Sequence, residues 1–133
     1  MKGFFEMSRE AVATTNAPSA IGPYSQGIKA NGFVYVSGQG PIIPGTKQFA
    51  GETVAAQTEQ ALKNIAAILK AAGTDMAHVV KCTVLLADMS TFAEMNAVYA
   101  AFFPAPAPAR TTFAAKGLPL DILVEIDAIA VMP

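Results

Sequence analysis

Few side chains in this 133-residue sequence are placed to do chemistry, and Arg110 is the most informative of them. The chain has two arginines, and Arg9 lies in a loose N-terminal part, so Arg110 is the only arginine of the expected folded body. A guanidinium group binds a carboxylate or a phosphate through a rigid two-pronged fork. Two interpretations are open, namely a structural ion pair with Asp or Glu and the binding of an anionic ligand.

Glu125 and Asp127 form the second candidate, because both lie within the apolar segment 122–129. If this segment is a strand, alternation places both carboxylates on one face, together with Leu123 and Ile129. Carboxylates in such a strand are seldom buried without a partner. Partial burial of Glu125 would favour a pKa suited to proton transfer near neutral pH. The alternative is a pair of solvent-facing carboxylates on an edge strand.

The remaining nucleophiles and metal ligands form no recognisable site. His78 and Cys82 are the only residues of their kinds, so neither a typical zinc site nor a disulfide within the chain is expected. Cys82 lies in a predicted buried strand, where cysteine more often packs than reacts. The segment Gly38-Gln39-Gly40 lacks the third glycine of a dinucleotide fingerprint, and no Walker-type phosphate loop is present. We therefore expect neither a metal nor a cofactor.

The first half of the chain must supply a hairpin and a long helix. Strands are predicted at 21–29 and 33–38, joined by an Asn31-Gly32 turn of the kind that favours positive φ. Apolar residues at helical spacing predict a helix over 52–72.

The second half alternates strands with a second helix. A strand is predicted at 79–87, apolar enough to be buried on both faces. A helix is predicted at 91–103, with a capping box over 91–94. The proline-rich run 104–108 is a stiff connector that fixes where the following strand begins. The last two strands are predicted at 110–115 and 122–131.

This order, β-β-α-β-α-β-β, predicts an α+β fold in which the helices cover one face of a single sheet, as a two-layer sandwich. Residues 9–133 are expected to form one domain, after a loose N-terminal extension over residues 1–8, with residues 9–20 extended or irregular. The second face of the sheet then needs another cover, which points to a partner subunit.

The composition limits the classes of protein to which the chain belongs. Charged residues make up 14% of it, against about 25% in typical domains, while 53% are hydrophobic and the net charge is -1. A disordered chain is excluded, and a nucleic-acid partner is not expected, because phosphate binding needs clustered Lys and Arg. The low charge is typical of a chain that buries surface in an oligomer. No membrane span or secretory signal is recognised, so a reduced, cytoplasmic location is expected.

Five short motifs occur in order at compatible spacing along residues 14–131. They are Ile21-Gly22-Pro23-Tyr24-Ser25-Gln26, Val36-Ser37-Gly38-Gln39, Met95-Asn96-Ala97-Val98-Tyr99, Pro108-Ala109-Arg110 and Val124-Glu125-Ile126-Asp127-Ala128-Ile129-Ala130. Each is weak alone, and together they closely resemble the Rid (reactive intermediate deaminase) family, also called YjgF or L-PSP. The chain is most similar to the RidA branch of that family.

The resemblance implies a chorismate-mutase-like fold that assembles as a homotrimer with clefts between subunits. It also implies a deaminase that hydrolyses 2-imino acids, with their enamine tautomers, to 2-oxo acids and ammonia, without a metal or cofactor. Carried over by position, Arg110 grips the substrate carboxylate, and Glu125 holds or activates the attacking water. The positions that match cleft-lining residues are Tyr24, Ser37 and Asn96.

Two features depart from the RidA pattern. Many members have a cysteine two residues after the arginine, where this chain has Thr112. Imine hydrolysis forms no covalent intermediate, so we expect Thr112 to be tolerated in the substrate site, contributing backbone groups and a hydroxyl. The connector before Arg110 is also shorter, which bears on substrate preference. Two other functions stay open: an L-PSP-type endoribonuclease or translation inhibitor, and a non-catalytic protein that binds small carboxylates.

Overall fold

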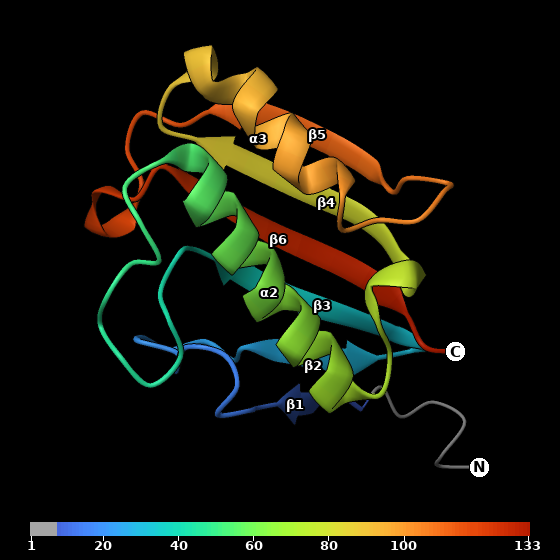
Figure 1. Cartoon of the computed structure of the whole chain (residues 1–133). Helices are drawn as coiled ribbons and strands as arrows, with labels where there is room; N and C mark the ends of the chain where they lie inside the picture. The colour runs from blue at the N-terminus through green and yellow to red at the C-terminus, as the bar shows by residue number, and fades with distance from the viewer. Residues whose placement is uncertain (1–7) are drawn as a thin grey trace, which may run out of the picture.

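A six-stranded sheet carries two helices on one of its faces in the computed structural model, which describes residues 8–133 (Figure 1). The strand order is β1-β2-β3-β6-β4-β5, with every neighbouring pair antiparallel except the parallel pair β4–β5. The strands are β1 (Glu10–Val12), β2 (Gly27–Ala30), β3 (Phe33–Gln39), β4 (Val79–Leu86), β5 (Ala109–Ala114) and β6 (Val124–Val131). This arrangement confirms the predicted α+β fold. The extension predicted over 1–8 lies, apart from residue 8, outside the described residues.

The hairpin between β2 and β3 forms where the sequence predicts it. Asn31 and Gly32 have φ angles of 52° and 82°, as a two-residue turn with positive φ at both positions requires. The strand before the turn is shorter than predicted, because residues 21–26 form a loop. Gln26 is buried, and its side-chain amide donates to the carbonyl oxygens of Thr14, Ala17 and Pro18. These bonds hold the chain irregular before β2, while β1 is an additional strand that the sequence did not predict.

Helix α2 (Val54–Ala72) begins two residues later than predicted and ends at the predicted residue. The Thr53 side chain accepts a hydrogen bond from the Ala56 amide at 3.1 Å, and Gly73 ends the helix in the left-handed conformation, with φ of 96°. The buried face of the helix packs on the sheet and forms the core with the inward side chains of β3, β4 and β6.

Helix α3 (Phe92–Ala100) is shorter at both ends than predicted, and the predicted capping box is wrong. Thr91 makes no capping hydrogen bond from its side chain to the helix, and donates instead to the Asp88 carbonyl oxygen. The Glu94 carboxylate accepts from the Ala55 amide at the start of α2. Long-range contacts between the helices have therefore replaced the local cap. Neither helix of residues 8–133 is both long and apolar enough to cross a membrane.

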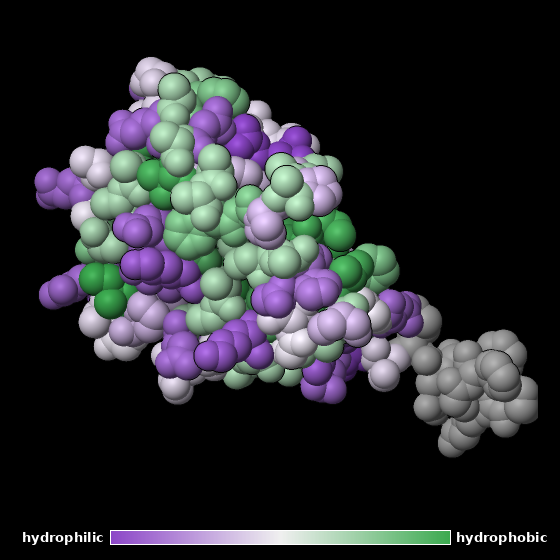
Figure 2. Space-filling view, turned by 45° about the vertical axis from the view of Figure 1, so that its right-hand side comes forward, coloured by the Kyte–Doolittle hydropathy of each residue, from purple (hydrophilic) through white to green (hydrophobic). Residues whose placement is uncertain are grey.

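The sheet has a helix-covered face and an open face. On β4, Cys82, Val84 and Leu86 are fully buried under the helices, whereas the alternate residues are only partly covered. Lys81, Thr83 and Leu85 are partly exposed, so the prediction that this strand is buried on both faces is wrong for the single chain. Exposed aromatic side chains also lie on strands of this sheet, namely Phe33, Tyr35 and Phe113. On the helical side, by contrast, apolar and polar surface is interspersed (Figure 2).

The buried Gln57 side chain ties the loop before α2 to the start of β6. Its amide nitrogen donates to the Gly51 carbonyl oxygen at 3.0 Å, and its oxygen accepts from the Leu123 amide at 2.7 Å. We expect Gln57→Leu to lower the free energy of unfolding by about 2–4 kcal/mol, because both backbone groups lose their partner. Urea unfolding at one fixed protein concentration measures this. Gln48→Leu, at an exposed position of the same loop, is the control, and equal stability of the two variants would contradict the prediction.

Candidate functional site

Arg110 lies on edge strand β5 and points to the helix-covered face. It is paired in register with Cys82 of β4, which is itself paired with Ala128 of β6, and both partners are buried under the helices. Its guanidinium carbon lies 4.8 Å from the centre of the Tyr99 ring and 5.6 Å from that of Phe92. Both distances are within the range of cation–π contact. The two rings come from α3, which runs beside β5 in Figure 1.

Among residues 8–133, no carboxylate lies within ion-pair distance of Arg110. The ion pairs of this part of the chain are Lys29–Glu10, Lys63–Glu59 and His78–Asp75. The interpretation of Arg110 as a structural ion pair is therefore wrong for the described residues. A positioned guanidinium without an anionic partner favours the second interpretation, the binding of an anionic ligand.

Two further predicted residues lie beside Arg110. Thr112 follows it by two positions on β5 and faces the same side of the sheet, in register with the buried Val84. Asn96 lies on α3, between Phe92 and Tyr99 at spacings of four and three residues, which places it on the same side of that helix. The side-chain oxygens of Asn96 and Thr112 are buried and have no hydrogen-bond partner within residues 8–133. Because buried polar atoms are normally paired, these oxygens are available to a ligand or water. We call Arg110, Thr112 and Asn96 the arginine group.

Glu125 lies on β6 in the middle of the sheet, so the prediction of an edge strand is wrong. It is partly buried on the open face, in register with Leu85 and, beyond it, Phe113. Burial raises the pKa of Glu125, and the nearby Asp127 carboxylate raises it further. Asp127 itself accepts a hydrogen bond from the Thr83 amide at 2.9 Å. A carboxylate with a raised pKa suits proton transfer near neutral pH.

Gly38 leaves the space that the Glu125 carboxylate occupies. It lies where the pairing of β3 with β6 shifts by one residue, between Val36 and Gln39. A Cβ atom at Gly38 would stand 2.6 Å from Glu125 Oε1, which is shorter than any normal contact. The position therefore needs glycine for close approach rather than for an unusual φ.

Ser37 precedes Gly38 on β3, and hydrogen bonds join it to the loop that carries Tyr24. The Ser37 hydroxyl donates to the Ser25 carbonyl oxygen at 2.6 Å, and the Ser37 amide donates to the Gln26 carbonyl oxygen at 3.0 Å. These bonds fasten the loop that carries Tyr24 to β3. Tyr24 is 48% exposed, and its hydroxyl accepts from the Ile21 amide. We call Glu125, Ser37 and Tyr24 the glutamate group.

The sheet separates the two groups within one chain. Arg110 and Thr112 point to the same face as their partners in register on β4 and β6, and these partners are buried under the helices. Glu125 points to the open face. The residues before and after it on β6, Val124 and Ile126, point to the opposite face and are fully buried. The two groups of candidate residues, which we call the half-sites, therefore lie on opposite faces of the sheet and not in a single cleft.

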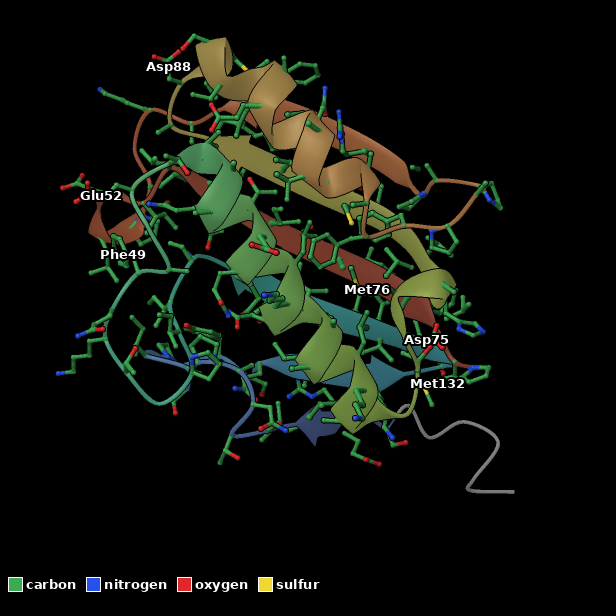
Figure 3. All side chains as sticks on the ribbon, in the orientation of Figure 1. Phe49, Glu52, Asp75, Met76, Asp88 and Met132 are labelled. Atoms are coloured by element: carbon green, nitrogen blue, oxygen red, sulfur yellow. The ribbon has the colours of Figure 1, made fainter. Side chains whose placement is uncertain are left out.

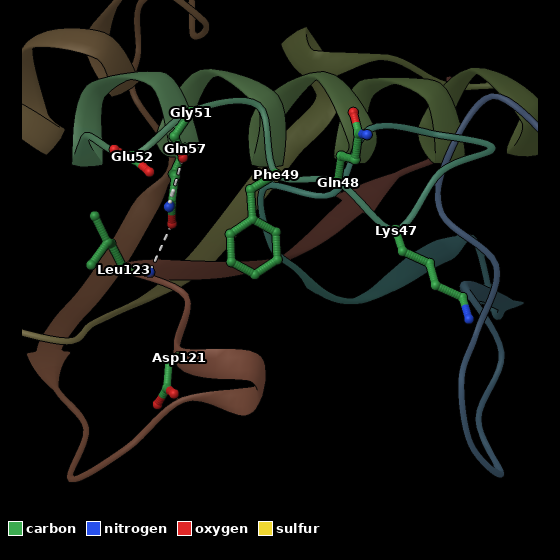
Figure 4. A pocket seen from close by; sticks show the side chains of 8 residues that line it. All are labelled: Lys47, Gln48, Phe49, Gly51, Glu52, Gln57, Asp121 and Leu123. Atoms are coloured by element: carbon green, nitrogen blue, oxygen red, sulfur yellow. Dashed lines mark hydrogen bonds between the residues drawn. The ribbon is translucent and has the colours of Figure 1, made fainter.

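Neither of two surface cavities contains residues of both half-sites. A cavity of about 540 Å³ lies between the loop before α2 and the turn before β6, and holds no residue of either group (Figure 4). Phe49 and Glu52 mark this end of the molecule in Figure 3, opposite Asp75 and Met132. The cavity is lined by Lys47, Gln48, Phe49, Gly51, Glu52, Gln57, Asp121 and Leu123. A second cavity, of about 440 Å³, has Tyr24 in its wall.

Two residues for which the sequence predicted no role in chemistry, His78 and Cys82, belong to neither group, although Cys82 lies next to Arg110 in register. His78 hydrogen-bonds the exposed Asp75 carboxylate at 2.7 Å, which lowers the pKa of Asp75. Cys82 is fully buried, as predicted, and burial raises the pKa of its thiol. Residues 8–133 contain no group of three or more His, Cys, Asp or Glu placed to hold a metal ion.

Known proteins are similar to this chain over nearly its whole length. The sequence model of the family described as Endoribonuclease L-PSP matches residues 14–132. The chain is 50% identical over 126 residues to Reactive Intermediate Deaminase A, chloroplastic, of Arabidopsis thaliana, covering 95% of this chain and 67% of that protein. It is 46% identical over 123 residues to the 2-iminobutanoate/2-iminopropanoate deaminase of Mus musculus, covering 92% and 91% of the two chains.

A solved structure shares the fold as well as the sequence. The crystal structure of E. coli TdcF with bound serine superposes with a TM-score of 0.88 at 38% identity, over 93% of this chain and 99% of that one. The ligand of that relative is a small amino acid, which carries a carboxylate.

Proposed function

This chain belongs to the endoribonuclease L-PSP family, which is also known as the Rid family, and we propose that it is a deaminase that hydrolyses reactive 2-imino acids to 2-oxo acids and ammonia. Relatives at 46% and 50% identity bear the names 2-iminobutanoate/2-iminopropanoate deaminase and Reactive Intermediate Deaminase A. The observation in this chain that carries the proposal is Arg110, a positioned guanidinium without an anionic partner among residues 8–133. We also propose a cytoplasmic location, where chains without internal disulfides such as this one are common.

The proposed reaction needs a carboxylate clamp and a base. Arg110 binds the carboxylate of the 2-imino acid through two N–H donors and fixes the orientation of the imine carbon. The substrate enters as the protonated imine. Glu125 takes a proton from water as the oxygen attacks the imine carbon, and a neutral carbinolamine forms. The carboxyl group returns that proton to the nitrogen, and the Glu125 carboxylate then takes the proton of the carbinolamine hydroxyl as the C–N bond breaks, which leaves a 2-oxo acid and ammonia. Ammonia takes up this last proton and leaves as ammonium, so Glu125 is ionised again. Oxygen from water thus replaces nitrogen, with no oxidation or reduction.

We further propose that the two half-sites meet between subunits of a homotrimer. Within one chain the sheet separates Arg110 from Glu125, so a cleft that holds both needs the arginine group of one subunit and the glutamate group of its neighbour. The partly exposed aromatic side chains of Tyr35 and Phe113 favour such an interface, because exposed apolar patches mark contacts between proteins.

A competition assay tests the proposed activity. An amino-acid oxidase generates 2-imino acids in solution, and semicarbazide traps them as semicarbazones that absorb in the ultraviolet. The protein is expected to lower the rate of semicarbazone formation in proportion to its concentration. An unchanged rate across small aliphatic, branched and aromatic imino acids would contradict the proposal and leave carboxylate binding without turnover.

We expect Gly38→Ala to lower kcat about 10- to 100-fold with little change in stability. The new Cβ would stand 2.6 Å from Glu125 Oε1, so the carboxylate has to move. Moving the end of a flexible side chain costs little in folding, but a misplaced base costs much of its contribution to the rate. Gly117→Ala is the matched control, because a Cβ there meets nothing within 4 Å. Equal kcat for the two variants would show that Glu125 is not placed as we describe.

A further inference from the structure

Arg110 has no ion-pair partner among residues 8–133, and its guanidinium contacts two aromatic rings instead. We propose that Tyr99 and Phe92 are positioning residues, whose rings hold the Arg110 guanidinium by its face and leave its N–H groups free for a ligand carboxylate. This inference rests on the proposed function, since it concerns the residue that binds the substrate carboxylate.

The spacing of the two rings suits this role. Tyr99 follows Phe92 by seven residues, or about two helical turns, so both rings project from the same side of α3. The Arg110 guanidinium carbon lies within 6 Å of both ring centres, at 4.8 Å and 5.6 Å. Arg110 is thus fixed by two points on one rigid element instead of by a flexible carboxylate.

Tyr99 is itself held firmly. It is only 6% exposed, and its ring packs against Phe103 with a centroid distance of 4.6 Å and an interplanar angle of 43°. Within residues 8–133 its buried hydroxyl forms a hydrogen bond neither with Arg110 nor with another group, so the ring makes the contact of Tyr99 with Arg110.

A ring has an advantage over a carboxylate in this position. A carboxylate would occupy the N–H donors of the guanidinium, and a ligand would have to displace it before binding. A ring attracts the cation through its π face and leaves the donors at the guanidinium edge unpaired. The site is then preorganised for an anion, so binding does not require an existing ion pair to break.

Direct binding tests the inference without turnover. The probe is 2-oxobutanoate, a product of the proposed reaction, titrated into the full-length protein and followed by calorimetry. We expect Tyr99→Leu and Phe92→Leu each to raise its Kd about 2- to 30-fold, the usual range of a cation–π contact. Tyr99→Phe, which keeps the ring, should recover most of the wild-type affinity. Phe49→Leu is the matched control, because it removes a ring from the loop before α2, in a cavity that holds no residue of the arginine group.

The remaining outcomes are equally decisive. Wild-type affinity in Tyr99→Leu would overturn the inference, as would equal weakening in Tyr99→Phe and Tyr99→Leu, since the hydroxyl would then be responsible. Absence of 2-oxobutanoate binding by the wild type would also overturn it. Binding that depends on Tyr99, in a protein that hydrolyses no imine, would support the inference while contradicting the proposed function. In imine hydrolysis, a positioning role predicts a raised KM with kcat changed less than twofold.

Discussion

Arg110→Ala is expected to lower kcat/KM for 2-imino acid hydrolysis about 100- to 1000-fold. The variant removes both charge-assisted hydrogen bonds to the substrate carboxylate, and loss of one partner of such a pair costs about 2–5 kcal/mol. Orientation of the imine carbon is lost with it. Arg110→Lys keeps the positive charge but loses the two-pronged guanidinium, so its kcat/KM should lie between those of the wild type and Arg110→Ala. The semicarbazide competition assay measures all three proteins.

The folded state should survive this change. Arg110 has no ion-pair partner among residues 8–133 and is partly exposed, so its removal leaves no buried carboxylate unpaired. Arg9→Ala is the matched control, because it removes the other arginine at an exposed position. Full activity in Arg110→Ala, or an equal loss in Arg9→Ala, would contradict the assignment of Arg110 to the substrate carboxylate.

Glu125→Gln is expected to lower kcat at pH 7 about 100-fold or more, because an amide cannot take a proton from water. The pH profile carries the same information. A base works only when deprotonated, so wild-type activity should decline as the pH falls through the pKa of Glu125, which burial and Asp127 raise above 4.5. In Glu125→Gln, the residual activity should lack this acid limb.

Stability separates loss of the base from damage to the fold. Because the pKa of Glu125 is raised in the folded chain, its ionised form opposes folding at neutral pH, and this effect is relieved as the pH falls. A neutral glutamine should therefore leave Tm at pH 7 unchanged or slightly higher. A large drop in Tm would attribute the lost activity to misfolding, and an acid limb that persists in the variant would exclude Glu125 as the titrating group.

The sequence was sufficient for the main elements of the fold. Apolar periodicity over 52–72 and the turn at Asn31-Gly32 are strong local signals, and both elements are present. Prediction from the sequence failed for elements that depend on contacts between residues far apart in the chain. The short β1 depends on pairing with β2 rather than on its own pattern. The box over 91–94 is absent because Glu94 bonds to the start of another helix.

The residues of the candidate site could be identified from the sequence, but their arrangement in space could not. Arg110 and Glu125 stand out because one is the only arginine of the folded body and the other is a carboxylate in an apolar strand. Their placement on opposite sides of the sheet follows from the pairing of β5 and β6 with β4, which no local pattern encodes. Tyr99 and Phe92 were not predicted as site residues, because their contact with Arg110 depends on how α3 packs.

The central claim is that Arg110 of one subunit and Glu125 of its neighbour act together on a 2-imino acid. The most direct measurement mixes the subunits of Arg110→Ala and Glu125→Gln, unfolded and refolded together in equal amounts, in the semicarbazide assay. Random assembly of a symmetric trimer gives about one site in four with both residues intact, so we expect about a quarter of wild-type activity. Each variant refolded alone should stay inactive. A mixture no more active than its separate components would contradict a site shared between subunits.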